Sequence, residues 1–439
     1  MTQTAEEQAA QPVQPADIVI VGGGPVGCWT ALQIKKRNPA ARITVYERKE
    51  VYERDHVLSI GKASFLQWSK NSDDNAGFLK SIFNAQATCS IASGLHAGGT
   101  KPAIDLGALP ASKFSYWRNL PKVLDIRTID FERILKEECE KSGVNFVYKK
   151  IETPEEIMDL HPECACFIAA DGANSKMRGA LWGADSVWKR DIYPSLDFKY
   201  ASEGQPGYLR VNTYDKLGHV YAENIGLEKD GKSDINLRII VSKAEYDAIP
   251  AATFKKPLTV TPDSPFWAGN GPSRLYGRTL KQDFYDLQDL RREYAKERPT
   301  DAPVTMTKIY LSQYCAKKFA KTVERNGQKK SWFLVGDAAM GMPFYRSVNS
   351  GLILGSQLGY LLTSRLVAEA AKTAVYNYYT RPCRILREFA RVAKTEARIM
   401  LYKNIFRPVF FKISQTPAAP LVRKPLDFAL KHLKYGKTS

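Results

Sequence analysis

The chain has 439 residues, of which 44% are hydrophobic and 25% charged, a composition typical of a soluble globular protein with room for two domains. Seven cysteines without a CxxC pair and five dispersed histidines without an HExxH pattern disfavour both a disulfide framework and a metal site. The net charge is +18, and no apolar run approaches the roughly 20 residues of a membrane-spanning helix.

The first sixteen residues are polar and contain two prolines. They have neither the positively charged start nor the apolar stretch of a secretory signal. We therefore expect a disordered leader over residues 1–16 and a cytoplasmic protein.

Residues 17–37 read as a buried strand, DIVIV, a glycine turn and a helix. In this context the GxGxxG spacing predicts a dinucleotide site: Gly22 allows the tight turn, Gly24 lets the backbone approach a pyrophosphate, and Gly27 permits close packing of the helix on the strand. Pro25 and Val26 open the helix, whose free N–H groups favour an anion.

A second strand, ARITVYE, ends at Glu47, 20 residues after Gly27. An acidic side chain at this spacing accepts hydrogen bonds from ribose hydroxyls and repels a 2′-phosphate, so the site suits FAD or NAD. Arg48 follows directly and joins the candidate site. The absence of a second GxGxxG and of a CxxxxC pair disfavours a disulfide reductase with two nucleotide domains.

Two further motifs follow apolar strands. FIAADGANSKMR contains Asp171, Gly172, Ser175 and Arg178, and FLVGDAAMGMP contains Gly336, Asp337 and Pro343. An extended dinucleotide needs separate contacts for its pyrophosphate, its sugar chain and its ring, so distant segments have to converge to bind it. Three such pieces in one chain favour FAD.

In order and spacing, these motifs resemble those of the FAD-dependent monooxygenases of the para-hydroxybenzoate hydroxylase class, over roughly residues 17–370. The resemblance implies a Rossmann-like α/β domain that binds FAD on the DG segment, with Asp337 on the ribityl chain. It also implies NADPH or NADH as electron donor.

Three positions are added by the same resemblance. Arg127 opens an amphipathic helix where the family has an Arg or Gln near the flavin. The stretch ERKEVYERDHVLSI is similar to the MICAL branch, which makes Arg54 an FAD contact and His56 a neighbour of the ring. A solvent-facing arginine and a satisfied loop histidine are the alternatives.

The third motif departs from the family pattern after Pro343. Asn349, Ser350 and Gly351 keep the helix start that faces the flavin, but Tyr345, Arg346 and Ser347 replace the glycine-rich turn. Tyr345, Arg346 and His56 are the catalytic candidates, because Arg346 can stabilise an anionic ring and Tyr345 can stack. A bulky turn can also narrow the oxygen pocket and weaken hydroxylation.

We expect an FAD domain over residues 17–185 and 305–372, interleaved with a mixed-sheet substrate domain over 186–304 and part of 60–120. Aromatic residues there, including Tyr208, Tyr214, Tyr221 and Trp267, suit a planar substrate or ordinary core packing. A basic helical region over 373–439 holds 14 Lys and Arg residues against three acidic ones from residue 381 on. It suits an anionic membrane surface or an acidic protein, with nucleic acid less favoured, or it simply packs on the core.

The expected function is hydroxylation or epoxidation of an aromatic or lipophilic small molecule with O2, by way of a hydroperoxide at the flavin C4a carbon. Two alternatives stay open: a MICAL-like oxidase that acts on a macromolecule or releases peroxide, and a flavin-binding docking module with little hydroxylation. The WxWxIP element of flavin-dependent halogenases is absent.

Overall fold

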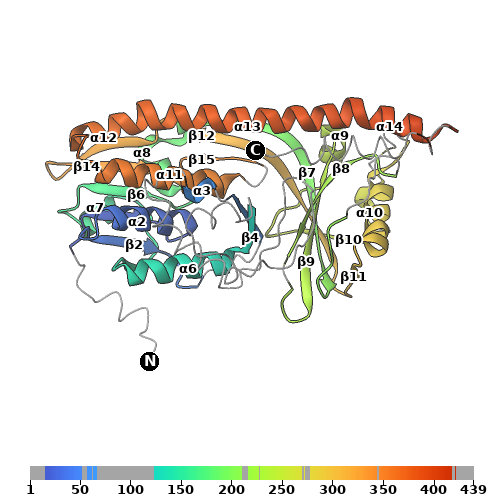
Figure 1. Ribbon diagram of the computed structural model, residues 1–439, viewed down its shortest axis with the longest axis horizontal. Coiled ribbons are helices and arrows are strands. Elements are labelled where there is room, and N and C mark those ends of the chain that lie inside the picture. Colours follow the sequence, from blue (N-terminus) through green and yellow to red (C-terminus); the bar gives the residue numbers. More distant parts are fainter. Residues whose placement is uncertain are drawn as a thin grey trace.

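The computed structural model describes residues 15–51, 57–61, 63–66, 123–209, 216–226, 228–268, 271, 277–343, 346–417 and 421. Two sheets and one long helical segment organise this part of the chain (Figure 1). The predicted leader lies almost entirely outside it.

The first sheet has the strand order β13-β14-β6-β1-β2-β5. Its strands are β1 (Ile18–Val21), β2 (Ile43–Glu47), β5 (Asn145–Tyr148), β6 (Cys166–Ala169), β13 (Ala320–Arg325) and β14 (Gln328–Leu334). Five of them are parallel, and β13 adds an antiparallel edge through a hairpin with β14. The continuous burial of β1 is typical of a parallel strand covered on both faces.

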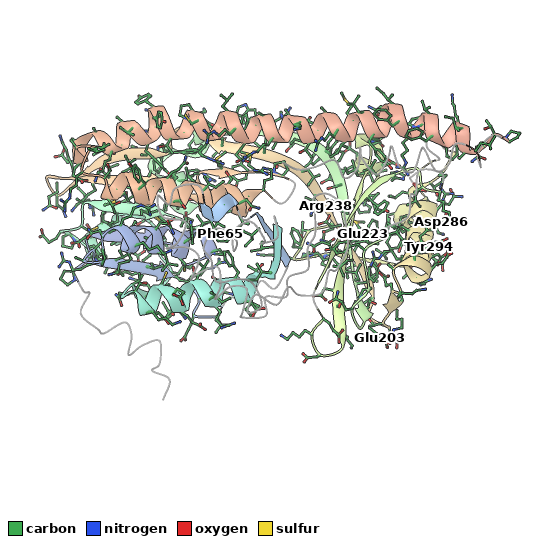
Figure 2. All side chains as sticks on the ribbon, viewed as in Figure 1. Phe65, Glu203, Glu223, Arg238, Asp286 and Tyr294 are labelled. Atoms are coloured by element: carbon green, nitrogen blue, oxygen red, sulfur yellow. The ribbon has the colours of Figure 1, made fainter. Side chains whose placement is uncertain are left out.

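Helices α2 (Pro25–Arg37), α6 (Thr128–Lys141) and α11 (Ser347–Thr363) pack side by side in this half of the molecule. Shorter elements complete it: β3 (Val57–Gly61), α3 (Ala63–Leu66), β4 (Val123–Arg127), α7 (Pro154–Leu160) and α8 (Lys176–Trp182). Strands β3 and β4 form a separate antiparallel pair. The edge-to-face contact of Trp29 with Phe65, 5.2 Å between ring centroids, packs α3 against α2; Phe65 is labelled in Figure 2.

The second sheet has the order β10-β12-β7-β9-β8, and every pairing in it is antiparallel. Its strands are β7 (Val187–Glu203), β8 (Val220–Ile225), β9 (Lys232–Ile240), β10 (Leu258–Val260), β11 (Arg298–Pro299), β12 (Val304–Ala316) and β15 (Met340–Gly341). Helices α9 (Lys243–Ala248) and α10 (Leu280–Tyr294) accompany it. The two sheets have separate clusters of buried apolar side chains.

A single helical segment runs along one edge of the molecule past both sheets (Figure 1). It consists of α12 (Glu369–Val375), α13 (Arg381–Leu401) and α14 (Arg407–Ser414), joined by π-helical turns at Tyr376–Thr380 and Tyr402–Phe406. None of the described helices combines the length and hydrophobicity that a membrane crossing requires.

Candidate nucleotide site

The three sequence motifs meet at one edge of the first sheet. Strands β1, β6 and β14 are neighbours and parallel, so the residues that follow them emerge at the same edge. In doubly wound sheets this carboxyl edge is where nucleotides bind. The order of the strands therefore brings together in space three motifs that lie far apart in the sequence.

Steric restrictions require glycine at two positions of the turn after β1. Gly22 has φ +108°, and a Cβ atom there would lie 2.5 Å from the carbonyl oxygen of Ala170; a Cβ at Gly27 would lie 2.0 Å from the carbonyl oxygen of Gly22. Gly24 differs, since nothing lies within 4 Å of the position of its Cβ. This open position at the N-cap of α2, a helix without a side-chain cap, is a cradle for an anionic group.

Glu47 lies beside this turn. The backbone N–H of Gly23 donates a hydrogen bond to Glu47 Oε2 at 2.7 Å, which holds the carboxylate at the mouth of the turn. Arg48, directly after it, is exposed. The arrangement fits the predicted contact of Glu47 with ribose hydroxyls.

A second acid, Glu132 of α6, was not identified from the motifs. Its side chain is buried, and its Oε2 atom has no hydrogen-bond partner among the described residues. Burial, reinforced by the charge of Glu47, raises the pKa of Glu132 to about 8, against an opposing effect of Lys136. The raised pKa favours the protonated form of Glu132, beside the predicted ribose contact Glu47.

Asp171 follows β6 and is partly buried. Its Oδ2 atom accepts a hydrogen bond from Met177 N–H at 3.2 Å, while its Oδ1 atom is buried without a partner in the described chain. Burial raises the pKa of Asp171, although hydrogen bonds from Ser175 and backbone N–H groups oppose the shift. At Gly172, φ is +88° and the Cβ position is open.

Arg178 connects the second motif to the third. Ser175 caps α8 by accepting from Arg178 N–H at 2.9 Å, and the Arg178 guanidinium donates to the carbonyl oxygens of Asp337 and Ala338, at 3.3 and 2.8 Å. A third bond goes to the Ala173 carbonyl oxygen. The arginine of the DGxxSxxR motif thus binds backbone carbonyl oxygens and stabilises the loop that carries Asp337. Tyr314 supports the same loop by donating a 3.0 Å hydrogen bond to the Asp337 carbonyl oxygen.

Asp337 is held by the turn that departs from the family pattern. The Ser347 hydroxyl donates to Asp337 Oδ1 and also accepts from Met342 N–H at 3.1 Å. Ser347 opens α11. The substitution therefore supplies a hydroxyl that closes the loop between Asp337 and this helix.

Asn349 and Ser350 lie one turn into α11. Asn349 Oδ1 accepts from Gly61 N–H and from the Ser64 hydroxyl, both at 2.7 Å, which ties β3 and α3 to α11. Ser350 is fully buried, and its hydroxyl contacts the Met340 sulfur at 3.7 Å. Pro343 is buried just before the turn.

Gly351 begins a stripe of glycines that brings α11 onto α2. A Cβ at Gly351 would lie 2.6 Å from Val26 Cγ2, one at Gly355 would lie 2.5 Å from Thr30 Oγ1, and one at Gly359 would lie 2.9 Å from Gln33 Cβ. Gly336 also packs on Val26. The four-residue spacing of these glycines is visible in the sequence and is typical of close helix packing. Gly355 and Gly359 lie outside the nucleotide-binding motifs and were not predicted.

Arg346, a predicted catalytic residue, has a partner on the long helix. Its Nε atom donates to Glu388 Oε2 of α13 at 2.8 Å. Glu388 is fully buried and is also paired with Arg384 and Arg391. Burial opposes its charge, but the hydrogen bond from Arg346 and the surrounding positive charges lower the pKa of Glu388 overall.

Arg384 is fully buried beside Glu388, and its Nε and Nη1 atoms lack hydrogen-bond partners among the described residues. Burial lowers its pKa to about 10, against the attraction of Glu388. Neither Arg384 nor Glu388 stood out in the sequence, where they belong to a generally basic helix.

The remaining predicted site residues lie outside this description. Arg54, His56 and Tyr345 are not among the described residues, and only the backbone of Arg127, at the end of β4, is described. Their assigned roles stay predictions.

Of the aromatic residues predicted to suit a planar substrate, the structure describes three. Trp267 is buried against Phe198 and Phe284, with ring centroids at 6.3 and 5.9 Å, so it is part of the core. Tyr221 is also buried and Tyr208 partly so, whereas Tyr214 lies outside the described residues.

Comparison with known proteins finds similar folds among solved structures. No family model matches the sequence, and no curated protein matches it. Among solved structures, the chain is similar to OxyS anhydrotetracycline hydroxylase from Streptomyces rimosus, with 17% identity, a TM-score of 0.53, and 97% of this chain and 77% of that one covered.

Two further structures extend the likeness. The Diels-Alderase PyrE3 of pyrroindomycin biosynthesis has 14% identity and a TM-score of 0.54, over 96% of this chain and 81% of that one. The tetrameric form of 2-methyl-3-hydroxypyridine-5-carboxylic acid oxygenase has 13% identity and a TM-score of 0.52, over 92% and 95%. The chain therefore shares the fold of these proteins, an α/β architecture with a second sheet and C-terminal helices, as predicted.

Proposed function

We propose that the protein binds FAD and is an NAD(P)H-dependent monooxygenase acting on an aromatic or lipophilic small molecule. One observation carries the proposal: the turn after β1, the DG segment after β6 and the GD segment after β14 lie at one edge of the sheet, with Arg178 and Val26 joining them. Two of the similar structures bear the names hydroxylase and oxygenase.

The residues present fit this cofactor. The open cradle at Gly24 suits a pyrophosphate, Glu47 suits a ribose, and Asp337 suits a ribityl chain. When bound, FAD would supply the chemistry of hydride acceptance and oxygen activation, while the protein orients it and excludes water.

The start of α11 supplies positive potential. The helix has no side-chain cap, and the first N–H groups of any helix lack intrahelical acceptors. The helix dipole and these N–H groups favour negative charge at this point. In our proposal this helix start would hold the flavin ring, and Arg346, whose side chain is paired with Glu388, would add positive charge there.

A second candidate is a flavoprotein with little hydroxylation. Ser347 is hydrogen-bonded to Asp337 and Arg346 to Glu388 of α13, so these two residues hold fixed contacts where the family pattern has glycines. The similarity to a Diels-Alderase accords with the rule that one fold supports different reactions. The MICAL-like alternative remains a prediction that rests mainly on residues outside the described part.

Transient kinetics of flavin reduction distinguishes these functions. We would mix the FAD-loaded protein with NADPH or NADH in the presence of phenols, quinones, polyprenyl compounds or acidic proteins. A monooxygenase should be reduced faster with one class of small molecule and should incorporate oxygen from O2 into it. Peroxide release without a small molecule supports the MICAL-like oxidase, and an absence of reduction by either nicotinamide contradicts both enzymes.

A further inference from the structure

The long helical segment has two different faces, and its inner face contacts both sheets. Asn377 accepts hydrogen bonds from Phe319 and Ala320 N–H at 2.7 and 2.9 Å, next to the first sheet. Glu396 pairs with Arg190 of the second sheet at 2.6 Å. Arg407 donates to the Leu217 carbonyl oxygen. The helix is therefore fixed along its length by contacts on one side.

The outer face carries a stripe of exposed apolar residues that these contacts do not explain. Leu386 is 74% exposed, Ile405 52%, Val409 48% and Leu401 42%, and the exposed alanines lie between them. We call these residues the outer stripe: Leu386, Ala390, Ala393, Ala397, Leu401, Ile405 and Val409. At about 1.5 Å per residue the stripe extends roughly 35 Å, and side chains project outward along this edge in Figure 2.

One border of the stripe is basic. Arg387, Arg391, Lys394 and Arg398 recur at helical spacing and are exposed. Of the acidic residues of α13, Glu396 is paired with Arg190, and Glu388 is paired with Arg346, Arg384 and Arg391. Arg387, Lys394 and Arg398 of this border therefore have no acidic partner among the described residues. A surface helix that combines an apolar strip with lysine and arginine has the properties of a helix that lies in the interface of an anionic bilayer.

We propose that the outer stripe docks the protein on an anionic membrane surface, with the helix parallel to the bilayer plane. The surface is straight and lies at an edge of the molecule (Figure 1), which suits a flat partner. A second copy of this chain would bring two basic borders of a +18 protein together. The proposal is independent of the proposed reaction.

Vesicle flotation with the full chain tests it. Wild-type protein should float with vesicles of phosphatidylcholine mixed with phosphatidylserine, should bind pure phosphatidylcholine far less, and should be released by salt. The double variant Leu401→Glu, Ile405→Glu should lose at least about tenfold in vesicle affinity. The matched double variant Phe254→Glu, Tyr294→Glu, at exposed positions of the other domain, should bind as wild type does.

A charge series separates electrostatic from apolar contributions. Changing Arg387, Lys394 and Arg398 to Gln should weaken binding by roughly two orders of magnitude at low salt, whereas Lys229→Gln, Lys255→Gln, Lys256→Gln should have little effect. Thermal unfolding of each variant verifies that it is folded. The proposal is overturned if wild type ignores anionic vesicles, if it binds polyglutamate but no vesicle, or if the two double variants behave alike.

Discussion

Arg178 and Asp337 are joined by a hydrogen bond from the Arg178 guanidinium to the Asp337 backbone carbonyl oxygen, at 3.3 Å, beside the 2.8 Å bond to Ala338. The contact spans 159 residues and links the DG and GD segments directly. A motif arginine that reads as a ligand contact thus acts on the backbone that presents Asp337.

Replacement of Arg178 by Gln should remove this brace, so that the Ala173 and Ala338 carbonyl oxygens lose the arginine donor, while the Asp337 carbonyl oxygen keeps only the bond from Tyr314. We expect a loss of about 1.5–3 kcal/mol in unfolding free energy, together with weaker FAD binding because Asp337 is no longer fixed. Chemical denaturation of the apoprotein measures the first effect. The matched change Arg48→Gln, at an exposed position, should leave stability near wild type; an unchanged stability of Arg178→Gln would show that the brace is dispensable.

The contact between α2 and α11 can be tested with two glycines in helices. Gly355→Ala places a methyl group 2.5 Å from Thr30 Oγ1, whereas Gly179→Ala in α8 meets nothing within 4 Å. We expect Gly355→Ala to cost about 1–3 kcal/mol through overpacking and Gly179→Ala to be neutral or to stabilise by up to about 1 kcal/mol. Equal melting temperatures would contradict this packing.

Glu388 should be one of the most sensitive positions of the long helix. Glu388→Gln leaves the charges of Arg346 and Arg384 unbalanced, so a loss of about 3 kcal/mol is expected. Glu396→Gln, which breaks a more exposed pair, should cost at most about 1 kcal/mol.

The pH dependence of Glu388 follows from its lowered pKa. Its stabilising contribution is present above the ordinary pKa of a glutamate and is lost as the pH falls through the lower value in the folded protein. The difference between wild type and Glu388→Gln should therefore shrink in acid. Denaturation curves recorded over acidic and neutral pH test this; a constant difference would argue against a charged Glu388.

The raised pKa of Glu132 predicts a pH dependence of stability opposite to that of Glu388. Since burial raises its pKa from 4.5 to about 8, it favours folding most below the ordinary value, and this advantage is lost as the pH rises through about 8. Glu132→Gln should therefore exceed wild type in stability by several kcal/mol, up to roughly 5, above pH ~8, with a gain of under about 1 kcal/mol near pH ~5. The control variant Glu140→Gln, at an exposed position of the same helix, should have wild-type stability at both acidic and alkaline pH. Parallel pH profiles for all three proteins would disprove the assignment.

Much of the candidate nucleotide site is predictable from the sequence because it depends on local patterns. A buried strand followed by glycine, DG or GD specifies where each piece leaves the sheet, and Glu47 lies at the expected position beside Gly23. Parallel strands then bring the pieces together without further information. The antiparallel edge strand β13 follows instead from a hairpin at Asn326 and Gly327, both with positive φ.

What escaped prediction depends on long-range packing. Arg346 and Glu388 are 42 residues apart, and nothing in a basic helix indicates which of its charges is buried. The hydroxyl of Ser347 gains its role only because the chain returns to Asp337. In the same way, the apolar outer stripe was hidden in the sequence by the inner apolar residues of the same helix.

The most direct test of the central claim is the equilibrium binding of FAD to the purified apoprotein, followed by flavin fluorescence and absorbance. The account predicts one FAD per chain, weaker binding of FMN and NADP, and at least about tenfold weaker FAD binding in Asp337→Ala with no loss in the exposed control Asp301→Ala. A protein that takes up no FAD, or an Asp337→Ala variant with wild-type affinity, would contradict it.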